Sequence, residues 1–184
     1  MSITTYYTAT SLDGYIADEQ HGLDWLLRQD QDEAGSLNYD GFFAQIGAMV
    51  MGSSTYEWVL RHGSGAWPYE LPTWVMTTRD VARAHEEVRL ARGDIRTVHD
   101  DMVRAAHGKD LWIVGGGELA GQFADAGLLD EVIVYIAPVT LGGGAPLLPR
   151  TLDLELRELA RNRAFACARY AVVRADPNDR RASR

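Results

Sequence analysis

Short apolar runs that alternate with helix-like segments constrain the fold more than any other feature of this sequence. The clearest run, residues 46–51, is continuously apolar and is stopped by Gly52, as expected for a strand buried on both faces. Parallel strands need long crossover connections, which helices usually supply. The alternation therefore predicts an α/β domain with a mostly parallel central sheet and flanking helices. Strands are predicted at 3–10, 46–51, 73–77, 95–98, 111–114 and 132–137. Helices are predicted at 39–45, 54–62, 80–92 and 118–126, with a short one that Asp100 or Asp101 caps and that ends near Gly108.

The last two predicted strands, 154–161 and 165–173, are expected to pair as an antiparallel hairpin at the edge of the sheet. Ser54 and Glu57 fit a capping box, with Ser54 as the cap of the helix that follows. The chain has 184 residues, 46% of them hydrophobic, which suits one globular domain. We expect this domain to cover residues 1–175 and the segment 176–184 to be a frayed tail.

The charge balance argues against two classes of partner. The chain carries 18 Lys and Arg against 26 Asp and Glu, a formal net charge of −8, and Lys109 is its only lysine. A nucleic-acid-binding domain needs a basic stripe, so no nucleic-acid partner is expected. No stretch approaches the length of a membrane-spanning apolar segment, and the N-terminus lacks the pattern of a signal peptide. We therefore expect no membrane association and a cytoplasmic location.

No metal site is predicted. Cys167 is the only cysteine, which excludes an intrachain disulfide and a cysteine-based zinc site, and it is expected to be a small buried side chain. The five histidines show no paired ligand spacing.

Three places share one design, in which a predicted strand ends in small or hydroxyl-bearing residues and a helix begins. Backbone N–H groups at a helix N-terminus are unpaired and lie at the positive end of the helix dipole, so they bind anions. Open α/β sheets bind ligands at the C-terminal ends of their strands. Three such junctions in one chain indicate a dinucleotide whose phosphates contact several loops. The junctions are Met51-Gly52-Ser53-Ser54-Thr55, Met76-Thr77-Thr78-Arg79-Asp80 and Val114-Gly115-Gly116-Gly117-Glu118.

An ordinary Rossmann site fits less well. Gly115, Gly117 and Gly121 approach its glycine spacing, but its ribose-binding acid is expected at the end of the next strand. That strand, 132–137, ends in Ile-Ala-Pro, and its nearest acids, Asp130 and Glu131, precede it.

Four segments carry a resemblance to a known family. They are Thr-Ser-Leu-Asp-Gly-Tyr-Ile-Ala at 10–17, Met-Gly-Ser-Ser-Thr-Tyr-Glu at 51–57, Ile-Val-Gly-Gly-Gly-Glu-Leu-Ala-Gly-Gln-Phe at 113–123 and Pro-Val-Thr-Leu-Gly-Gly-Gly-Ala-Pro-Leu at 138–147. The second and third resemble the cofactor motifs of the dihydrofolate reductase fold. The first and fourth resemble the riboflavin-biosynthesis reductase domain, the C-terminal domain of a bifunctional deaminase/reductase. The resemblance runs from about residue 3 to 173 and implies a stand-alone dihydrofolate reductase-like domain.

The resemblance implies NADPH as hydride donor, and it does not exclude NADH. By position, three sets of residues would hold the cofactor. The adenine-side phosphates would be lined by Gly52, Ser53, Ser54 and Thr55. The adenosine end would be held by Thr77, Thr78 and Arg79, with Arg79 a partner for the 2′-phosphate. The pyrophosphate and nicotinamide would lie along Gly115, Gly116 and Gly117, with Glu118, Leu119 and Gln122 beside them. A cis peptide between Gly115 and Gly116 is also implied.

The sequence departs from dihydrofolate reductases at two points. These enzymes often have Arg where Ser53 stands and another basic residue near Glu118, so the choice between NADPH and NADH stays open. Their folate-binding carboxylate has no clear equivalent, with Asp40 the nearest candidate, which argues against dihydrofolate reductase activity itself.

Few residues are candidates for the substrate side. Asp13 could donate a proton, directly or through a water, or could bind its own turn as Asp-Gly sequences often do. A substrate of the riboflavin pathway carries a phosphate and would need a basic pocket, for which Arg61 and Arg150 are available. Tyr135 could face either side of its strand. The residues Trp25, Phe43, Trp67 and Trp74 could shape a planar pocket but fit the core better.

The sequence thus predicts a reductase that transfers hydride from NAD(P)H to a small organic molecule. A compound with a pterin-like or pyrimidine-like ring is one candidate for that molecule. A non-catalytic dinucleotide-binding module or sensor is the alternative. The resemblance also implies a homodimer.

Overall fold

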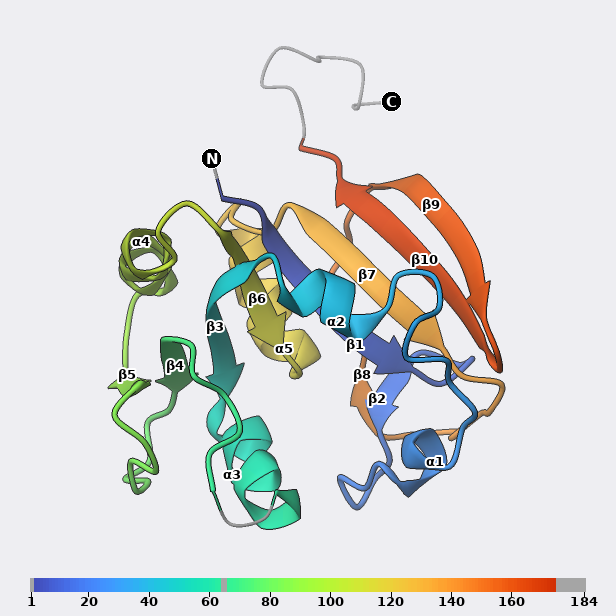
Figure 1. Cartoon of the computed structure of the whole chain (residues 1–184), viewed down its shortest axis with the longest axis horizontal. Helices are drawn as coiled ribbons and strands as arrows, with labels where there is room; N and C mark the ends of the chain where they lie inside the picture. Colours follow the sequence, from blue (N-terminus) through green and yellow to red (C-terminus); the bar gives the residue numbers. More distant parts are fainter. Residues whose placement is uncertain (1, 64–65, 175–184) are drawn as a thin grey trace.

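An eight-stranded sheet forms the centre of the molecule (Figure 1). The computed structural model describes residues 2–63 and 66–174, so the predicted tail at 176–184 lies outside the described residues. The strands are β1 (Thr4–Thr10), β3 (Ile46–Gly52), β4 (Thr73–Met76), β5 (Val88–Ala91), β6 (Asp110–Val114), β7 (Glu131–Ile136), β9 (Leu154–Asn162) and β10 (Phe165–Val172). Their spatial order is β5-β4-β3-β6-β1-β7-β10-β9.

The sheet is parallel from β5 to β7, whereas β10 runs antiparallel to β7 and β9 antiparallel to β10. The predicted mostly parallel sheet with an antiparallel C-terminal edge is confirmed. A small second sheet, which the sequence did not predict, pairs β2 (Tyr15–Ala17) with β8 (Ala145–Pro146).

Helices cover both faces of the sheet. They are α1 (Asp24–Leu27), α2 (Tyr39–Phe43), α3 (Ser53–His62), α4 (Ile95–Ala105) and α5 (Gly117–Asp125). On β3, Ala48 and Val50 pack in the core under α4 and α5, while Met49 and Met51 pack in the core under α3. Successive side chains of a strand alternate between faces, so an apolar core on both faces explains the unbroken apolar run at 46–51.

A third apolar cluster joins α1 to the antiparallel edge. Trp25 of α1 packs with Tyr135 of β7 and with Phe165 and Cys167 of β10. Cys167 is fully buried, which confirms the prediction from sequence.

Two predicted elements are wrong. Residues 80–92 are not a helix: Tyr56 Oη donates to the carbonyl of Ala82 and accepts from the amide of Ala84, both at 2.8 Å, and Val88 is fully buried in β5. Residues 95–98 are not a strand but the first turn of α4, which Asp94 caps by accepting a hydrogen bond from the amide of Arg96. Asp100 and Asp101 therefore lie inside this helix.

The predicted capping box at the start of α3 is also wrong. The N-cap is Gly52, which offers no side-chain cap, and the Glu57 carboxylate accepts a hydrogen bond from Arg79 Nη2 at 3.0 Å. No helix in the described residues is long and apolar enough to cross a membrane.

Close contact between α4 and β3 depends on Gly47. A Cβ at Gly47 would lie 2.4 Å from the carbonyl oxygen of Ala106, at the end of α4, and 2.8 Å from Cβ of Lys109. Gly47 is also the extra residue of a β-bulge, because Ile46 pairs with Asp110 and Ala48 with the next residue, Leu111. The glycine therefore lets the chain after α4 return directly into β6.

We predict that Gly47→Ala lowers the free energy of unfolding by about 1–3 kcal/mol, because backbone atoms must move to admit the methyl group. Chemical denaturation followed by far-UV circular dichroism measures this. Gly52→Ala is the matched control: its added Cβ would meet nothing within 4 Å, so stability should hold or rise by up to about 1 kcal/mol. Equal losses for the two variants would contradict the packing argument.

Candidate functional site

The three predicted strand-to-helix junctions lie side by side at the carboxyl ends of the parallel strands, although only those after β3 and β6 lead into a helix. Gly52 at the end of β3 is the register partner of Met76 at the end of β4, and Met51 is the partner of Val114 at the end of β6. The chain continues from these three strand ends into the first turn of α3, the turn at Thr77–Arg79 and the first turn of α5. The structure therefore brings together the segments that the sequence proposed for a dinucleotide.

Two helix N-termini in this region lack side-chain caps. The N-caps of α3 and α5 are Gly52 and Gly116, whereas Asp94 caps α4 and Asn38 caps α2 with their own side chains. The first N–H groups of α3 and α5 are thus left for an external acceptor such as a phosphate oxygen. A Cβ on Gly52 would enter open space, so the backbone there is accessible from outside.

Glycine is required where β6 turns into α5. Gly115 and Gly116 have φ angles of 58° and 73°, a region that favours glycine. A Cβ on Gly117 would lie 2.3 Å from the carbonyl oxygens of Pro146 and Leu147. The peptide bond between Gly115 and Gly116 is trans, so the cis bond implied by the resemblance is absent from this structure. These residues fit the close approach of a dinucleotide to bare backbone.

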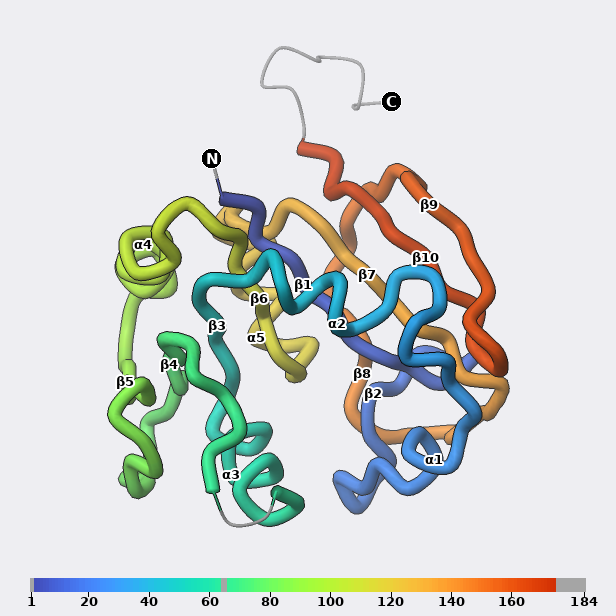
Figure 2. Tube along the Cα trace, viewed as in Figure 1, coloured from blue at the N-terminus to red at the C-terminus, as the bar shows by residue number. Residues whose placement is uncertain are grey.

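A cleft of about 860 Å³ opens beside the junctions. The tube view shows α1 and α3 at the same end of the molecule (Figure 2), and both helices contribute side chains to the cleft. Of the predicted cofactor residues, Ser54, Thr55, Gly115 and Gly116 line it. The site residues that line the cleft therefore belong to the first turn of α3 and to the glycine turn.

Aromatic side chains form the floor of the cleft, and their polar atoms bond to the backbone. Tyr7 Oη donates to the carbonyl of Leu37 at 3.3 Å, Tyr135 Oη to the carbonyl of Ser36 at 2.8 Å, and Trp112 Nε1 to the carbonyl of Tyr7 at 3.1 Å. Burial raises the pKa of the Tyr7 and Tyr135 phenols, so both stay protonated at neutral pH. These rings offer mainly apolar surface to a ligand.

The turn after β4 is built by Thr77 and carries Arg79. Thr77 is buried, and its Oγ1 accepts from the amide of Arg79 at 3.0 Å, while Thr78 is exposed. Arg79 Nη2 reaches across to α3 and donates to Ser53 Oγ at 2.9 Å and to Glu57 at 3.0 Å. The guanidinium thus lies at the start of α3, outside the cleft lining and next to Gly52.

The predicted residues of α5 lie elsewhere. Leu119 is buried in the core, and the exposed Glu118 and Gln122 are not part of the cleft lining. The Glu118 carboxylate binds Arg150 through both guanidinium NH₂ groups, at 2.8 and 3.1 Å, and Asp125 accepts from Arg150 Nε at 2.8 Å. These contacts hold Arg150 over α5, so it is not a phosphate ligand in the cleft.

The Asp13 side chain links its own turn to the turn at residues 141–142 through hydrogen bonds. Its carboxylate accepts hydrogen bonds from Ser11 Oγ at 2.6 Å and from the backbone amides of Leu141 and Gly142 at 2.7–3.1 Å. These hydrogen bonds lower the pKa of Asp13 to about 2. The carboxylate does not line the cleft, so this arrangement favours the turn-binding role over proton donation.

Sequence reasoning missed most of the cleft walls. Leu23, Leu26 and Leu27 line the side that belongs to α1, and Trp58 lines the side of α3. Trp58 and Arg61 lie within the predicted helix 54–62, one and two turns after Ser54, so a helical projection from Ser54 could have found them. Trp25, Trp67 and Trp74 are buried in the core, as the sequence favoured, and neither Phe43 nor Asp40 lines the cleft.

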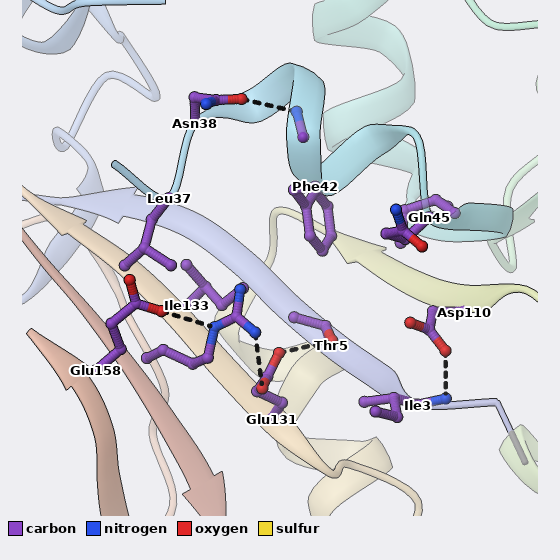
Figure 3. A pocket seen from close by; sticks show the side chains of 13 residues that line it. Ile3, Thr5, Leu37, Asn38, Phe42, Gln45, Asp110, Glu131, Ile133 and Glu158 are labelled. Atoms are coloured by element: carbon purple, nitrogen blue, oxygen red, sulfur yellow. Dashed lines mark hydrogen bonds and ion pairs between the residues drawn. The ribbon is translucent and has the colours of Figure 1, made fainter. Parts of the chain in front are cut away.

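A second, smaller cavity of about 340 Å³ lies at the opposite ends of β1 and β7 (Figure 3). Arg169 lies between Glu131 and Glu158, with nitrogen–oxygen distances of 3.7 and 3.8 Å, and Thr5 Oγ1 donates to Glu131. This network links β7, β10 and β9, and the remaining charged group of the lining, Asp110, accepts a hydrogen bond from the amide of Ile3 at 2.9 Å. Across residues 2–63 and 66–174, no cluster of three or more His, Cys, Asp and Glu side chains could hold a metal ion.

We predict that Asp13→Asn weakens the tie between the two turns and that its effect depends on pH. The folded pKa of Asp13 lies below the unfolded value of 3.8, so its charged form stabilises the fold above pH 3.8, and this stabilisation is lost as the pH falls toward about 2. The difference in unfolding free energy between the original chain and Asp13→Asn should shrink across that window. A difference that is constant from pH 6 to 2 would contradict the lowered pKa.

Comparison with known proteins places the chain in a family. The model of the RibD C-terminal domain matches residues 67–169, more than half of the chain. The uncharacterized protein YwjB of Bacillus subtilis is 33% identical over 145 residues, which cover 78% of this chain and 81% of YwjB.

Solved structures extend this likeness to the whole fold. A Shewanella sp. PV-4 protein assigned to riboflavin biosynthesis is 28% identical, with a TM-score of 0.80, over 94% of this chain and 99% of that one. The diaminohydroxyphosphoribosylaminopyrimidine deaminase/5-amino-6-(5-phosphoribosylamino)uracil reductase of Thermotoga maritima is 16% identical, with a TM-score of 0.62, over 94% of this chain but only 57% of that one. Dihydrofolate reductase of Enterococcus faecalis, complexed with NADP(H), is 17% identical, with a TM-score of 0.56, over 92% and 96% of the two chains. The last two matches concern the fold alone. They confirm the dihydrofolate reductase-like architecture, and the family match shows that the chain belongs to the RibD C-terminal domain family.

Proposed function

We propose that this chain is a reductase that transfers hydride from a nicotinamide dinucleotide to a small organic molecule. One observation carries the proposal: two uncapped helix N-termini and a glycine turn meet beside a large cleft lined by aromatic rings. Backbone amides at helix N-termini can bind phosphates, and an apolar, partly closed cleft beside them can hold a nicotinamide ring. The reductases named among the structural neighbours support the same class of reaction.

Each part of the chain has a defined task in this proposal. The amides of the first turns of α3 and α5 bind the phosphates, with help from the hydroxyls of Ser53, Ser54 and Thr55. Gly115 and Gly116 admit the nicotinamide end to the cleft. A bound NAD(P)H supplies the hydride, and the aromatic floor holds the acceptor against it and excludes water from one face.

The proton that completes the reduction is assigned to solvent. Direct donation by Asp13 needs its acid form, which a pKa of about 2 makes scarce at neutral pH. Burial raises the pKa of the cleft tyrosines Tyr39 and Tyr69, which makes their phenols weak acids. The cleft is open to water, so a water molecule can protonate a C=N or C=O group as hydride arrives.

The lack of a suitable proton donor among Asp13, Tyr39 and Tyr69 also favours the second candidate function, a dinucleotide-binding module without catalysis. The two functions differ in one observable. Both predict that the cofactor binds, but only the reductase oxidises it when an acceptor is present.

Arg79 is proposed to select NADPH over NADH. Its guanidinium lies at the adenosine side of α3, where a 2′-phosphate would pair with it. Glu57 already forms an ion pair with this guanidinium, and the negative charge of Glu57 would repel the phosphate. We therefore expect a modest preference for NADPH.

We predict that NADPH at about 100 times its dissociation constant raises the melting temperature by roughly 5–10 °C. Arg79→Gln should weaken NADPH binding about tenfold and leave NADH binding unchanged, since one charge-assisted hydrogen bond is lost. Glu57→Gln is the matched control and should tighten NADPH binding. Loss of absorbance at 340 nm with a panel of ring-containing acceptors then tests turnover.

The outcomes separate the two candidate functions. No shift with either dinucleotide contradicts both of them, and equal shifts for NADPH and NADH remove the role of Arg79. Binding without oxidation of NADPH by any acceptor supports the non-catalytic module.

A homodimer is also proposed, and the exposed leucines of β9 support it. Leu154, Leu156 and Leu159 are 40%, 51% and 70% exposed on an edge strand, opposite Val172, Tyr170 and Ala168 of β10. Apolar side chains in a row on an edge strand are a frequent contact surface between copies of a chain.

We predict that Leu159→Arg shifts the chain from dimer to monomer, because it buries a charge in the contact. Size-exclusion chromatography with light scattering measures the mass. A dimer of unchanged stability in this variant would contradict the assignment of the contact to β9.

A further inference from the structure

Positive charge is scarce where a substrate would lie. Among the residues that line the cleft, Arg61 and His21 are the basic ones, and both are exposed. Glu57 lines the same cleft, so the formal charge of the lining is zero with His21 neutral. Arg79 and Arg150 are bound to carboxylates and lie outside the lining. Beyond the amides of α3 and α5 that the proposed cofactor would occupy, a substrate phosphate in this cleft would find no buried cationic partner.

Both walls of the cleft carry large apolar side chains, beside polar lining residues such as Gln29, Gln31 and Arg61. Leu27 of α1 is 65% exposed although it is a large apolar side chain, and it lines the cleft together with Leu26. Trp58 on α3 lines the cleft as well, with the His62 ring stacked on it at 4.3 Å and an interplanar angle of 16°. An exposed leucine and a half-buried tryptophan that line one open cleft are the expected lining for a flat apolar ligand.

The floor is suited to the same kind of ligand. The polar atoms of Tyr7, Tyr135 and Trp112 already bond to backbone carbonyls, so the surface that these rings leave open to a ligand is apolar. Tyr7 is half-buried, whereas Tyr135 and Trp112 are only 3% and 5% exposed. A sugar, whose hydroxyls need several partners, would lose hydrogen bonds with water on such a surface and regain few.

We propose that the cleft is a binding site for an uncharged aromatic or heteroaromatic ring that carries no phosphate, and that a molecule of this class is the hydride acceptor. The second half of the statement rests on the proposed reductase function, whereas the ring-binding site does not. The structural neighbour from Thermotoga maritima is named for a phosphoribosylamino substrate. By this inference, the present chain accepts a substrate of the same flat shape without the phosphorylated sugar.

Isothermal titration calorimetry with two probes tests the inference. Lumazine, a neutral bicyclic heteroaromatic, should bind once per chain, both in the absence and in the presence of NADPH. Ribose 5-phosphate at the same concentration should give no binding heat.

Four variants locate the site. Leu27→Asp and Trp58→Ala should each weaken lumazine binding by about 5- to 100-fold, the range expected for loss of apolar or stacking contact, while Trp58→Phe should retain most of the affinity. Leu90→Asp is the matched control: Leu90 is 44% exposed on β5, outside the cleft lining, so this variant should bind lumazine normally. A fifth variant, Arg61→Gln, is made only to test any binding heat seen with ribose 5-phosphate.

Three results would overturn the inference: no lumazine binding, lumazine binding that Leu27→Asp leaves intact, or ribose 5-phosphate binding that Arg61→Gln abolishes. NADPH is titrated against the same protein in a separate experiment. A chain that binds lumazine but not NADPH retains the ring site and fails the proposed reductase function. A chain that binds NADPH but not lumazine fails this inference alone.

Discussion

The candidate site depends on the close packing of the turn from β6 into α5 against its neighbours. Gly117 lies so close to the carbonyl oxygens of Pro146 and Leu147 that no larger residue fits, and a Cβ on Gly115 would lie 2.9 Å from Thr55 Oγ1. The first contact brings α5 against β8, and the second brings the start of α3 against the end of β6. Because both glycines allow close approach, they fix the spacing of the two uncapped helix N-termini. A side chain at either glycine would separate the elements that form the candidate cofactor site.

Ion pairs then decide which positive charges remain for a ligand. Arg150 is held by Glu118 and Asp125, across the position of Gly121, where a Cβ would lie 3.0 Å from the arginine side chain. This contact holds the segment after β8 against α5. The positive charge of Arg150 is therefore neutralised by carboxylates of the protein itself. Arg79 is shared between Ser53 and Glu57 and lies at the exposed start of α3. With these two arginines engaged this way, an anion at the candidate site would be bound mainly by backbone amides, which do not distinguish strongly between dinucleotides.

The buried strands and the glycine turns could be predicted from sequence, but the walls of the cleft could not. Residues 46–51 and 111–114 are apolar on both faces, and that pattern favours a buried parallel strand in an α/β chain. Residues 81, 84, 88 and 91 have helical spacing, yet Tyr56 from a distant helix binds 82–84 in an irregular path and β4 captures Val88 as a strand. The helix prediction failed because this tertiary contact cannot be inferred from the spacing of nearby residues. The leucines at 23, 26 and 27 have helical spacing, but they lie in a short polar stretch, and only the folded chain shows that they line the same cleft as Trp58.

The order of the strands divides the site into two chemically different halves. The C-terminal ends of β4, β3 and β6 supply small residues and free amides, whereas β1, β7 and β10 supply Tyr7, Tyr135 and Phe165. The halves meet between β6 and β1, where Val114 and Tyr7 are register partners and Gly115 follows directly. Open α/β sheets bind their ligands outside the carboxyl ends of their strands, and this boundary lies at those ends. A hydride donor held by the polar half would therefore have its reactive end at the edge of the aromatic half. This juxtaposition follows from strand order, so it would hold whatever ring compound the aromatic half accepts.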